Sequence, residues 1–163
     1  LAGAPSKKLT HALATFRGVE RRFSYKINSE NLVLIDDYAH HPTEIDALYQ
    51  AVSELYPEDQ KLIVFQPHLF SRTKDFVEGF SESLSKFDSI LLMDIYPARE
   101  EPVPGITSEW LLNKISNPNK SLVSREDLPA KIKQSRARVK LLVGAGDIGA
   151  EVSKITKKLS HEA

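Results

Sequence analysis

Short apolar runs alternate with helical patterns through most of this chain, and that alternation restricts the folds open to it. The runs are continuous rather than alternating, which is typical of strands covered on both faces. They fall at residues 32–35, 62–65 and 89–93, and two further runs, at 121–123 and 139–143, are also expected to be strands. A helical pattern follows each run, so five strand–helix units succeed one another and predict a parallel α/β sheet.

One more strand is expected at the start of this series. Residues 21–27 alternate polar and apolar side chains, as an edge strand covered on one face does. Residues 28–31 then turn the chain directly into the run at 32–35, which favours a hairpin. The fold class we expect is a doubly wound, mostly parallel, Rossmann-like sheet of about six strands with one antiparallel edge strand.

The helices are expected where apolar residues recur at spacings of three and four. A short helix over residues 9–16 would end at Gly18. Ser124 and Asp127 have the spacing of a capping box ahead of Leu128. The apolar faces of the other helices are Ile45, Leu48, Val52 and Leu55; Phe76, Val77, Phe80 and Leu84; Trp110, Leu111 and Ile115; and Ile148, Val152, Ile155 and Leu159.

A cluster of polar residues joins the first apolar run to the helix after it. It contains Asp36, Asp37, Tyr38, His40 and His41. In an open α/β sheet this turn lies at the carboxyl ends of the strands, where ligands bind. Two carboxylates, a phenol and two imidazoles gathered on one turn indicate a functional site, and the simpler interpretation is a solvated loop with one capping Asp.

A second polar cluster follows the second apolar run. His68 and Arg72 pair an imidazole with a guanidinium, a combination that can clamp a carboxylate or a phosphate. The competing interpretation is a loop contact within the fold. A metal site built from His40 and His41, with His68 and Asp37, is less favoured because adjacent side chains on one turn seldom face the same ion.

Three glycines, Gly144, Gly146 and Gly149, match the dinucleotide-binding fingerprint between a strand and a helix. A true fingerprint opens a βαβ unit and has an acidic residue about 20 positions further on, and the sequence stops before that position. We therefore interpret the glycines as allowing a tight turn and close helix packing. The helix N-terminus would be free to face an anion or a partner domain.

A phosphoacceptor receiver domain is an alternative from a different class. Acidic residues end two strands, at Asp36 with Asp37 and at Asp94, and Ser124 follows the next strand, as in a receiver. The last strand of a receiver ends in a Lys that contacts the phosphoryl group, whereas this one ends in Val143. The two imidazoles of the first cluster are also foreign to receivers, so we expect Asp94 to take no phosphoryl group.

Composition limits the partners of the chain. Its 163 residues suit one domain that buries roughly two thirds of its unfolded surface. The 22 basic and 22 acidic side chains cancel, so no net field attracts nucleic acid or an anionic membrane, and no apolar run reaches membrane-spanning length. The lack of cysteine fits a reducing compartment, and we expect a cytoplasmic location. The first residue, Leu1 rather than Met, suggests a fragment of a longer protein.

Several motifs occur in order along the chain: DDYAHHPTE at 36–44, FQPH at 65–68, SRT at 71–73, DIY at 94–96, EP at 101–102 with Gly105, and GAGDI at 144–148. Together they resemble the C-terminal domain of the Mur ligases, the ATP-dependent ligases of peptidoglycan synthesis. The segment RRF at 21–23 also fits, so the likeness runs from about Phe16 to the last helix. Within the family, the motifs are most similar to the ligase that joins L-alanine to UDP-N-acetylmuramate.

The resemblance implies a reaction shared among an N-terminal, a central and a C-terminal domain. ATP phosphorylates the muramate carboxylate, and the alanine amine then displaces phosphate from the acyl phosphate. The family's phosphate-binding loop and Mg²⁺ ligands belong to the central domain, and no such loop occurs in this sequence. We expect residues 1–15 to be a linker or remnant of the central domain, residues 16–163 to be the C-terminal domain, and this fragment to be inactive alone.

The resemblance also implies roles for individual positions. Leu69 stands where some members carry an arginine, which leaves Arg72 to act alone on the alanine carboxylate. A sibling, the murein-peptide recycling ligase, tends to have Phe in place of Tyr38 and is the alternative within the family. The resemblance implies that Asp37 and His41 contact ATP, with Asp37 at the ribose. It implies that Tyr38 and His40 line the junction of nucleotide and amino acid. His68 and Arg72 would hold the incoming alanine.

Overall fold

The computed structural model describes residues 3, 5–16 and 18–160 and confirms the expected α/β fold. The expectations for residues 1, 2, 4, 17 and 161–163 lie outside the described residues. The strands are β1 (Ser24–Asn28), β2 (Val33–Asp37), β3 (Lys61–Phe65), β4 (Ser89–Leu92), β5 (Lys120–Leu122) and β6 (Val139–Val143). The helices are α1 (Ser6–Thr15), α2 (Pro42–Leu55), α3 (Phe70–Asp75), α4 (Val77–Ser85), α5 (Ser108–Lys114), α6 (Leu128–Gln134) and α7 (Ile148–Ser160).

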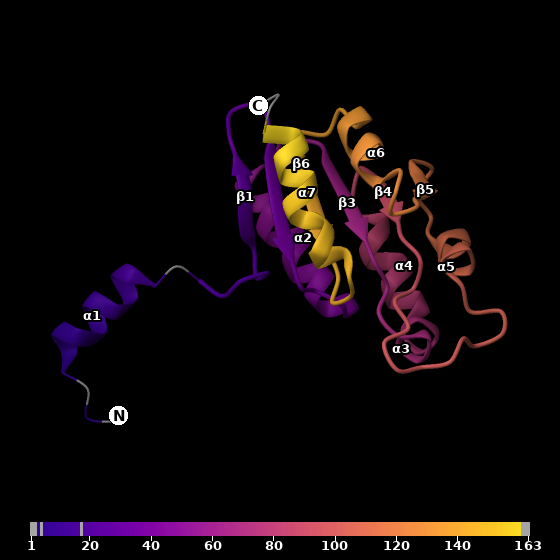
Figure 1. Cartoon of the computed structure of the whole chain (residues 1–163), viewed down its shortest axis with the longest axis horizontal. Helices are drawn as coiled ribbons and strands as arrows, with labels where there is room; N and C mark the ends of the chain where they lie inside the picture. The colour runs from indigo at the N-terminus through magenta and orange to yellow at the C-terminus, as the bar shows by residue number, and fades with distance from the viewer. Residues whose placement is uncertain (1–2, 4, 17, 161–163) are drawn as a thin grey trace.

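The six strands form one sheet in the order β1-β2-β6-β3-β4-β5 (Figure 1). β1 is antiparallel to β2, and the other neighbouring strands are parallel, which confirms the single antiparallel edge strand. β6, the last strand in sequence, inserts between β2 and β3. The carboxyl ends of β2, β6 and β3 are therefore adjacent, and the loops that follow them meet at one edge of the sheet.

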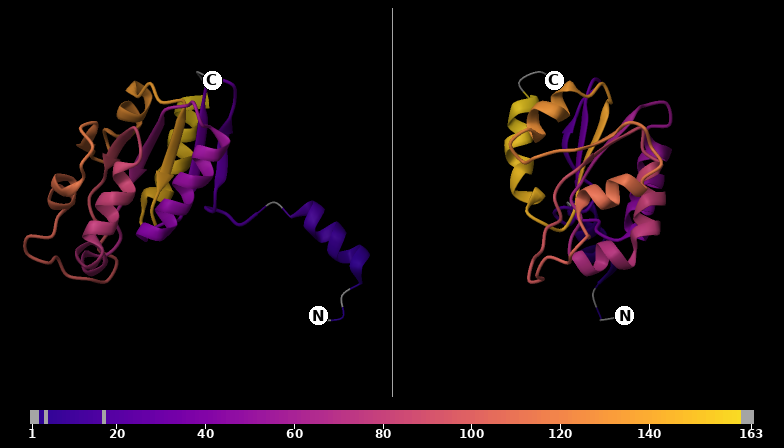
Figure 2. Two further views of the ribbon diagram at one scale, coloured as in Figure 1. Left: turned by 180° about the vertical axis from the view of Figure 1, so that it is seen from behind. Right: turned by 90° about the vertical axis from the view of Figure 1, so that its right-hand side faces the viewer.

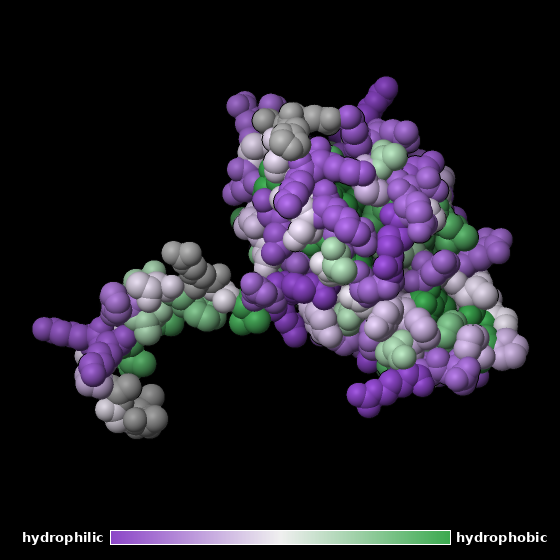
Figure 3. Space-filling view, in the orientation of Figure 1, coloured by the Kyte–Doolittle hydropathy of each residue, from purple (hydrophilic) through white to green (hydrophobic). Residues whose placement is uncertain are grey.

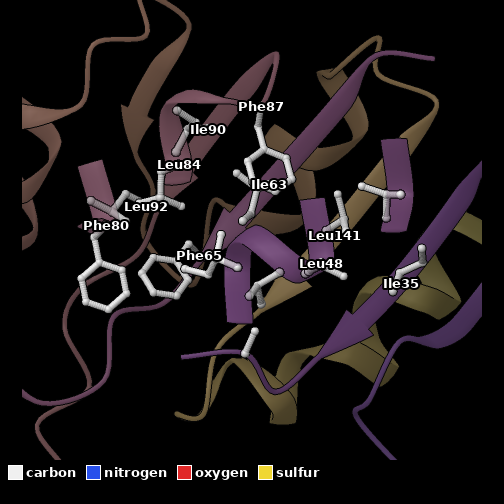
Figure 4. Packing of buried hydrophobic residues seen from close by; sticks show 14 of the residues in the cluster. Ile35, Leu48, Ile63, Phe65, Phe80, Leu84, Phe87, Ile90, Leu92 and Leu141 are labelled. Atoms are coloured by element: carbon white, nitrogen blue, oxygen red, sulfur yellow. The ribbon is translucent and has the colours of Figure 1, made fainter. Parts of the chain in front are cut away.

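Helices cover both faces of the sheet, as the right-hand view of Figure 2 shows. One face packs on α2, α4 and α5, and the other packs on α6 and α7. The first cluster includes Phe65 of β3 and Phe80 of α4, whose ring centroids lie 5.5 Å apart (Figure 4). β2 and β3 are buried on both sides, as their continuous apolar runs predicted, and β6 is buried too, although Lys140 interrupts its apolar residues.

The N-terminal segment differs from expectation in two places. The first helix begins at Ser6 rather than at residue 9, and none of its residues is buried; it stands apart from the sheet in Figure 1. The edge strand begins at Ser24 rather than at Arg21, because Arg21 and Phe23 adopt positive φ angles of 57° and 47°. Left-handed residues cannot continue a pleated strand, so the alternating pattern overstated its length.

Three details of the helices also differ. Phe76 does not lie on a core-facing helical face: it separates α3 from α4, with φ −113°, and its side chain is 44% exposed. Leu55, at the end of α2, is 57% exposed, whereas Ile45 and Val52 are buried as expected. The Ser124 hydroxyl accepts the Asp127 N–H at 3.1 Å, as a capping box requires, but α6 begins only at Leu128.

The face of the molecule seen in Figure 3 is mainly polar. Figure 3 shows hydrophilic residues over most of the visible face, with apolar residues in small patches between them. No helix within the described residues is both long and apolar enough to cross a membrane.

Candidate functional site

The two polar clusters predicted from the sequence lie at the same edge of the sheet. The first spans the end of β2 and the turn after it, the second follows β3, and the glycine-containing loop follows β6 between them. α3 and the start of α7 mark this edge at the lower end of the sheet in Figure 1. The sheet order, rather than proximity in the sequence, brings these side chains together.

Asp36 is a buried carboxylate with two cationic neighbours. Its side chain is 2% exposed, and Arg21 Nε lies 3.3 Å and Lys26 Nζ 3.8 Å from its oxygens. Burial raises the pKa of Asp36 above its ordinary value, and the charges of Arg21 and Lys26 offset part of that effect. Asp36 therefore anchors the end of β2 rather than facing a ligand.

Asp37 organises the turn after β2. Its Oδ2 accepts the N–H of Phe23 at 2.7 Å, and its Oδ1 accepts the N–H of Ala39 at 2.8 Å. Each carboxylate oxygen retains a lone pair for a further donor. An open pocket of about 270 Å³ adjoins this carboxylate and is lined by Arg22, Phe23, Asp37, Glu44, Ala47, Leu48 and Ala51.

His40 is held in one orientation by its neighbours. Its Nδ1 lies 2.9 Å from the carbonyl oxygen of Tyr38 and 3.3 Å from Glu44 Oε2. Both partners only accept, so Nδ1 carries the proton and Nε2 is left with a lone pair when the ring is neutral. The Tyr38 ring meets the His40 ring edge-on at 5.4 Å, and Tyr38 is 37% exposed.

His41 performs a structural task at the start of α2. Its Nδ1 accepts the N–H of Thr43 at 3.4 Å and the Thr43 hydroxyl at 2.9 Å, while Glu44 Oε2 accepts the N–H of His41 at 3.2 Å. These contacts form a capping box. The ring also packs edge-on against Phe76 at 4.5 Å. His41 Nδ1 is therefore occupied by the helix start, and only Nε2 remains for a ligand.

His68 and Arg72 are paired as the sequence suggested. Arg72 Nη1 lies 3.2 Å from His68 Nδ1, and because a guanidinium only donates, Nδ1 must accept and the proton of the neutral ring sits on Nε2. The His68 ring stacks on Tyr96 at 5.7 Å. Burial, followed by the charges of Arg72 and His40, lowers the pKa of His68 below its ordinary value. The imidazole is thus kept neutral beside a permanent cation.

The loop after β4 braces the helix that carries Arg72. Glu100 accepts the backbone N–H of Ser71 at 3.0 Å and also the Ser71 hydroxyl, and these hydrogen bonds lower the pKa of Glu100. Leu69, the N-cap of α3, has φ 74°, a strained angle for a residue with a side chain. The backbone N–H of Leu69 donates to the Tyr96 carbonyl at 2.9 Å, so the strained turn is fixed to the same loop.

Four of the six predicted site residues form one continuous group. Tyr38 contacts His40, the His40 and His68 rings lie 6.1 Å apart, and His68 holds Arg72. Asp37 is adjacent in the chain but directs its carboxylate into the turn, and His41 points to the start of α2 and Phe76. Within the described residues, no group of three His, Cys, Asp or Glu side chains is arranged to hold a metal ion.

Sequence reasoning missed several residues that build this edge. Gln66 Oε1 accepts the N–H of Ile148 at 2.8 Å, and its Nε2 donates to Asp147 Oδ1 at 2.7 Å, which joins β3 to the start of α7. Burial alone would raise the pKa of Asp147, but the hydrogen bonds from Gln66 and Arg125 lower it. Gln66 and Asp147 stand in the motifs FQPH and GAGDI, but no local pattern pairs them, because they lie 81 positions apart in the sequence.

The structure is an α/β domain with a polar site at the carboxyl ends of its parallel strands. Comparison with known protein families and solved structures shows which family has this domain. Residues 21–148 match the family model described as "Mur ligase, glutamate ligase domain". The chain belongs to the Mur ligase family. It is 60% identical over 161 residues to the UDP-N-acetylmuramate–L-alanine ligase of Christiangramia forsetii, a match covering 99% of this chain and 36% of the relative.

Other relatives agree. The chain is 60% identical over 159 residues to the protein of the same name from Flavobacterium johnsoniae, covering 98% of this chain and 35% of that one. The solved structure of the UDP-N-acetylmuramate-alanine ligase of Thermotoga maritima has a TM-score of 0.76 at 26% identity, covering 99% of this chain and 35% of that one. The chain thus spans about a third of the length of the curated relatives it matches.

Proposed function

We propose that this chain is the C-terminal domain of an ATP-dependent ligase that joins L-alanine to UDP-N-acetylmuramate in the cytoplasm. Residues 16–163 form the domain, and residues 1–15 connect it to a central and an N-terminal domain of the same protein. The observation that carries the proposal is the convergence of Tyr38, His40, His68 and Arg72 at one sheet edge, in a chain 60% identical to ligases of that name.

The reaction assigns two chemical steps to the complete protein. The muramate carboxylate attacks the terminal phosphorus of ATP, ADP leaves, and an acyl phosphate forms. The alanine amine then attacks the acyl carbon, phosphate leaves, and the amine loses a proton as the amide forms. Mg²⁺ would neutralise phosphate charge in the first step, and because the described residues offer no suitable ligand group, we assign its ligands to the central domain.

The residues of this chain bind and orient the reactants. Arg72 would pair its guanidinium with the alanine carboxylate in a bidentate geometry, and His68 Nε2–H would donate to the same ligand. His40 Nε2 and the Tyr38 hydroxyl would line the junction of nucleotide and amino acid. The free lone pairs of Asp37 would accept the ribose hydroxyls, and His41 Nε2 would lie at the nucleotide's side of the turn.

Replacing Arg72 by Lys in the full-length enzyme tests the carboxylate clamp. The charge survives but the planar fork is lost, so the carboxylate stays poorly paired at a cost of about 2 to 4 kcal/mol. We expect the kcat/KM for alanine to fall on the order of 30-fold to 1000-fold, and the apparent affinity for ATP to change much less. Steady-state kinetics with alanine and ATP varied separately measure both.

Lys74→Arg is the matched control, because Lys74 is an exposed cation on the same short helix. It should leave both kinetic constants unchanged. If the Arg72→Lys enzyme had normal alanine kinetics, Arg72 would not bind the alanine carboxylate, and its pairing with His68 would serve the fold alone.

The two alternatives are not favoured. Likeness to the murein peptide ligase of Psychrobacter arcticus, at TM-score 0.67 and 20% identity, shows the shared fold alone. That alternative predicts ligation of a murein peptide in preference to free alanine, and an assay in which the two substrates compete separates the alternatives. The receiver alternative requires Asp94 to be phosphorylated by acetyl phosphate, which mass spectrometry of the intact chain would detect.

A further inference from the structure

The fingerprint-like glycines form a socket for two side chains of this chain. A Cβ atom added to Gly149 would lie 2.7 Å from Cζ and Nη1 of Arg21, and one added to Gly146 would clash with Gln66 Oε1. Real Cβ atoms do not approach other atoms so closely, so side chains at these positions would displace Arg21 or Gln66. The loop that resembles a dinucleotide cradle is thus filled from within by protein groups.

Arg21 reaches this socket from the segment ahead of β1. Its Nη2 donates to the carbonyl of Gly144 at 2.6 Å, and its Nε lies 3.3 Å from the buried carboxylate of Asp36. Its own backbone is left-handed, with φ 57°, which side chains adopt at some cost. Two polar contacts therefore fix the position of one guanidinium at the carboxyl ends of β2 and β6.

The same residue also holds Tyr38 by two contacts. The N–H of Tyr38 donates to the carbonyl oxygen of Arg21 at 2.7 Å, and the guanidinium carbon of Arg21 lies 5.0 Å from the centroid of the Tyr38 ring. That distance is within the range of a cation–π interaction. Tyr38 in turn meets the ring of His40 edge-on at 5.4 Å, so the orientation of Arg21 is passed on to the proposed binding residues.

We propose that Arg21 is a positioning residue for ligation: seated in the glycine socket, its guanidinium sets the ring of Tyr38 and, through it, His40 at the junction of nucleotide and amino acid. The effect of Arg21 on catalysis rests on the proposed function, because it requires that Tyr38 and His40 bind the reactants. Gly149 then serves the site by leaving room for Arg21. Binding groups displaced by about 1 Å can lose on the order of a hundredfold in rate, so the effect should be measurable.

Arg21→Lys in the full-length enzyme keeps a cation beside Asp36 but loses the planar group over Tyr38. We expect kcat/KM to fall on the order of tenfold to a hundredfold. In a Tyr38→Ala background the same change should have little further effect, because the ring that Arg21 positions is gone. A role confined to fold stability predicts equal effects of Arg21→Lys in both backgrounds and would overturn the proposal.

Lys26→Met is the matched control. Lys26 pairs with the same buried carboxylate from another side, at 3.8 Å, and makes no recorded contact with Tyr38. Its loss should lower the unfolding temperature while kcat/KM stays within about twofold of the wild-type value. A fall in kcat/KM equal to that of Arg21→Lys would assign the effect to Asp36 rather than to Tyr38.

A spectroscopic measurement separates this proposal from the proposed function. Fluorine NMR of the protein labelled with 3-fluorotyrosine gives a Tyr38 signal, identified by its loss in Tyr38→Phe. Arg21→Lys should shift that signal, and Lys26→Met should leave it in place, whether or not the enzyme ligates alanine. If the wild-type enzyme failed to ligate alanine, the proposed function would be refuted but the positioning of Tyr38 would not. If the Tyr38 signal did not move in Arg21→Lys, the positioning role would be refuted.

Discussion

His68 can accept the hydrogen bond from Arg72 only while its Nδ1 is unprotonated. Burial, Arg72 and His40 together lower the pKa of His68 below its ordinary value of 6.5. In the window just below 6.5, the unfolded chain therefore binds more protons than the folded chain does. The free energy of unfolding should therefore rise as pH rises through this window.

His68→Gln should flatten that dependence, because glutamine offers an acceptor to Arg72 without titrating. Urea unfolding of the chain at several values between about pH 5 and 7 measures the slope. His11→Gln, on the exposed helix α1, is the control and should keep the wild-type slope. An identical slope in His68→Gln would show that His68 titrates normally in the folded chain.

Gly144 needs to be glycine for two reasons: its backbone angle and the atoms that lie next to it. It has φ 145°, and a Cβ there would lie 2.7 Å from the carbonyl oxygen of Gln66, which belongs to the backbone and cannot rotate away. Gly105 also has positive φ, 81°, but has no atom within 4 Å of its Cβ position. Gly144→Ala thus adds a steric clash to backbone strain, and Gly105→Ala adds strain alone.

We expect Gly144→Ala to lower the free energy of unfolding by about 2 to 4 kcal/mol and Gly105→Ala by about 1 kcal/mol. Denaturant titrations of the two variants give the difference. Equal losses would mean that the loop after β6 can move away from Gln66 at little cost.

At the scale of secondary structure, the start of α2 links stability to the site. Glu44 Oε2 accepts the backbone N–H groups of His40, at 2.8 Å, and of His41, at 3.2 Å. It therefore satisfies backbone donors at the turn that presents the imidazoles. The helix cap and the orientation of His40 depend on one carboxylate.

Glu44→Ala should lower the free energy of unfolding by about 0.5 to 2 kcal/mol, as loss of a helix cap does. Glu54→Ala, near the other end of α2, removes an exposed hydrogen bond from Gln50. This control should change the free energy of unfolding by less than about 0.5 kcal/mol. Denaturant unfolding and amide hydrogen exchange at His40 and His41 are the measurements. Unchanged exchange in Glu44→Ala would mean that solvent or another group caps the helix equally well.

For the whole molecule, the proposal assigns phosphate binding to another domain. The sequence has no Gly-x-Gly-Lys-Thr/Ser loop, and the described part of the chain shows no metal-binding cluster. Its two-sided core, by contrast, is complete around the sheet. These features predict a chain that folds independently but handles ATP poorly.

We expect the isolated 163-residue chain to unfold cooperatively and to release no phosphate from ATP above background. A coupled phosphate-release assay, with the full-length enzyme as positive control, measures the activity. Phosphate release by the pure fragment, retained after Arg72→Lys, would show an ATP site within the chain that differs from the one proposed.

The sequence by itself determined the kinds of element and the edge that carries the site. Continuous apolar runs report burial on both faces, so the runs at 32–35 and 62–65 identified two buried strands directly. Polar residues after such runs must lie at the carboxyl ends of a parallel sheet, which placed His40, His68 and Arg72 at one edge without any knowledge of the strand order.

Only the tertiary structure decided which side chains meet there. Arg21 contacts Asp36 across 15 positions and Gly144 across 123, and Gln66 contacts Asp147 across 81. The pairings with Gly144 and Asp147 follow from the insertion of β6 between β2 and β3, and no local periodicity encodes any of the three. The alternating pattern at 21–27 predicted a strand, and the contacts of Arg21 overrode it, because a paired and partly buried guanidinium outweighs a weak local preference for extended backbone.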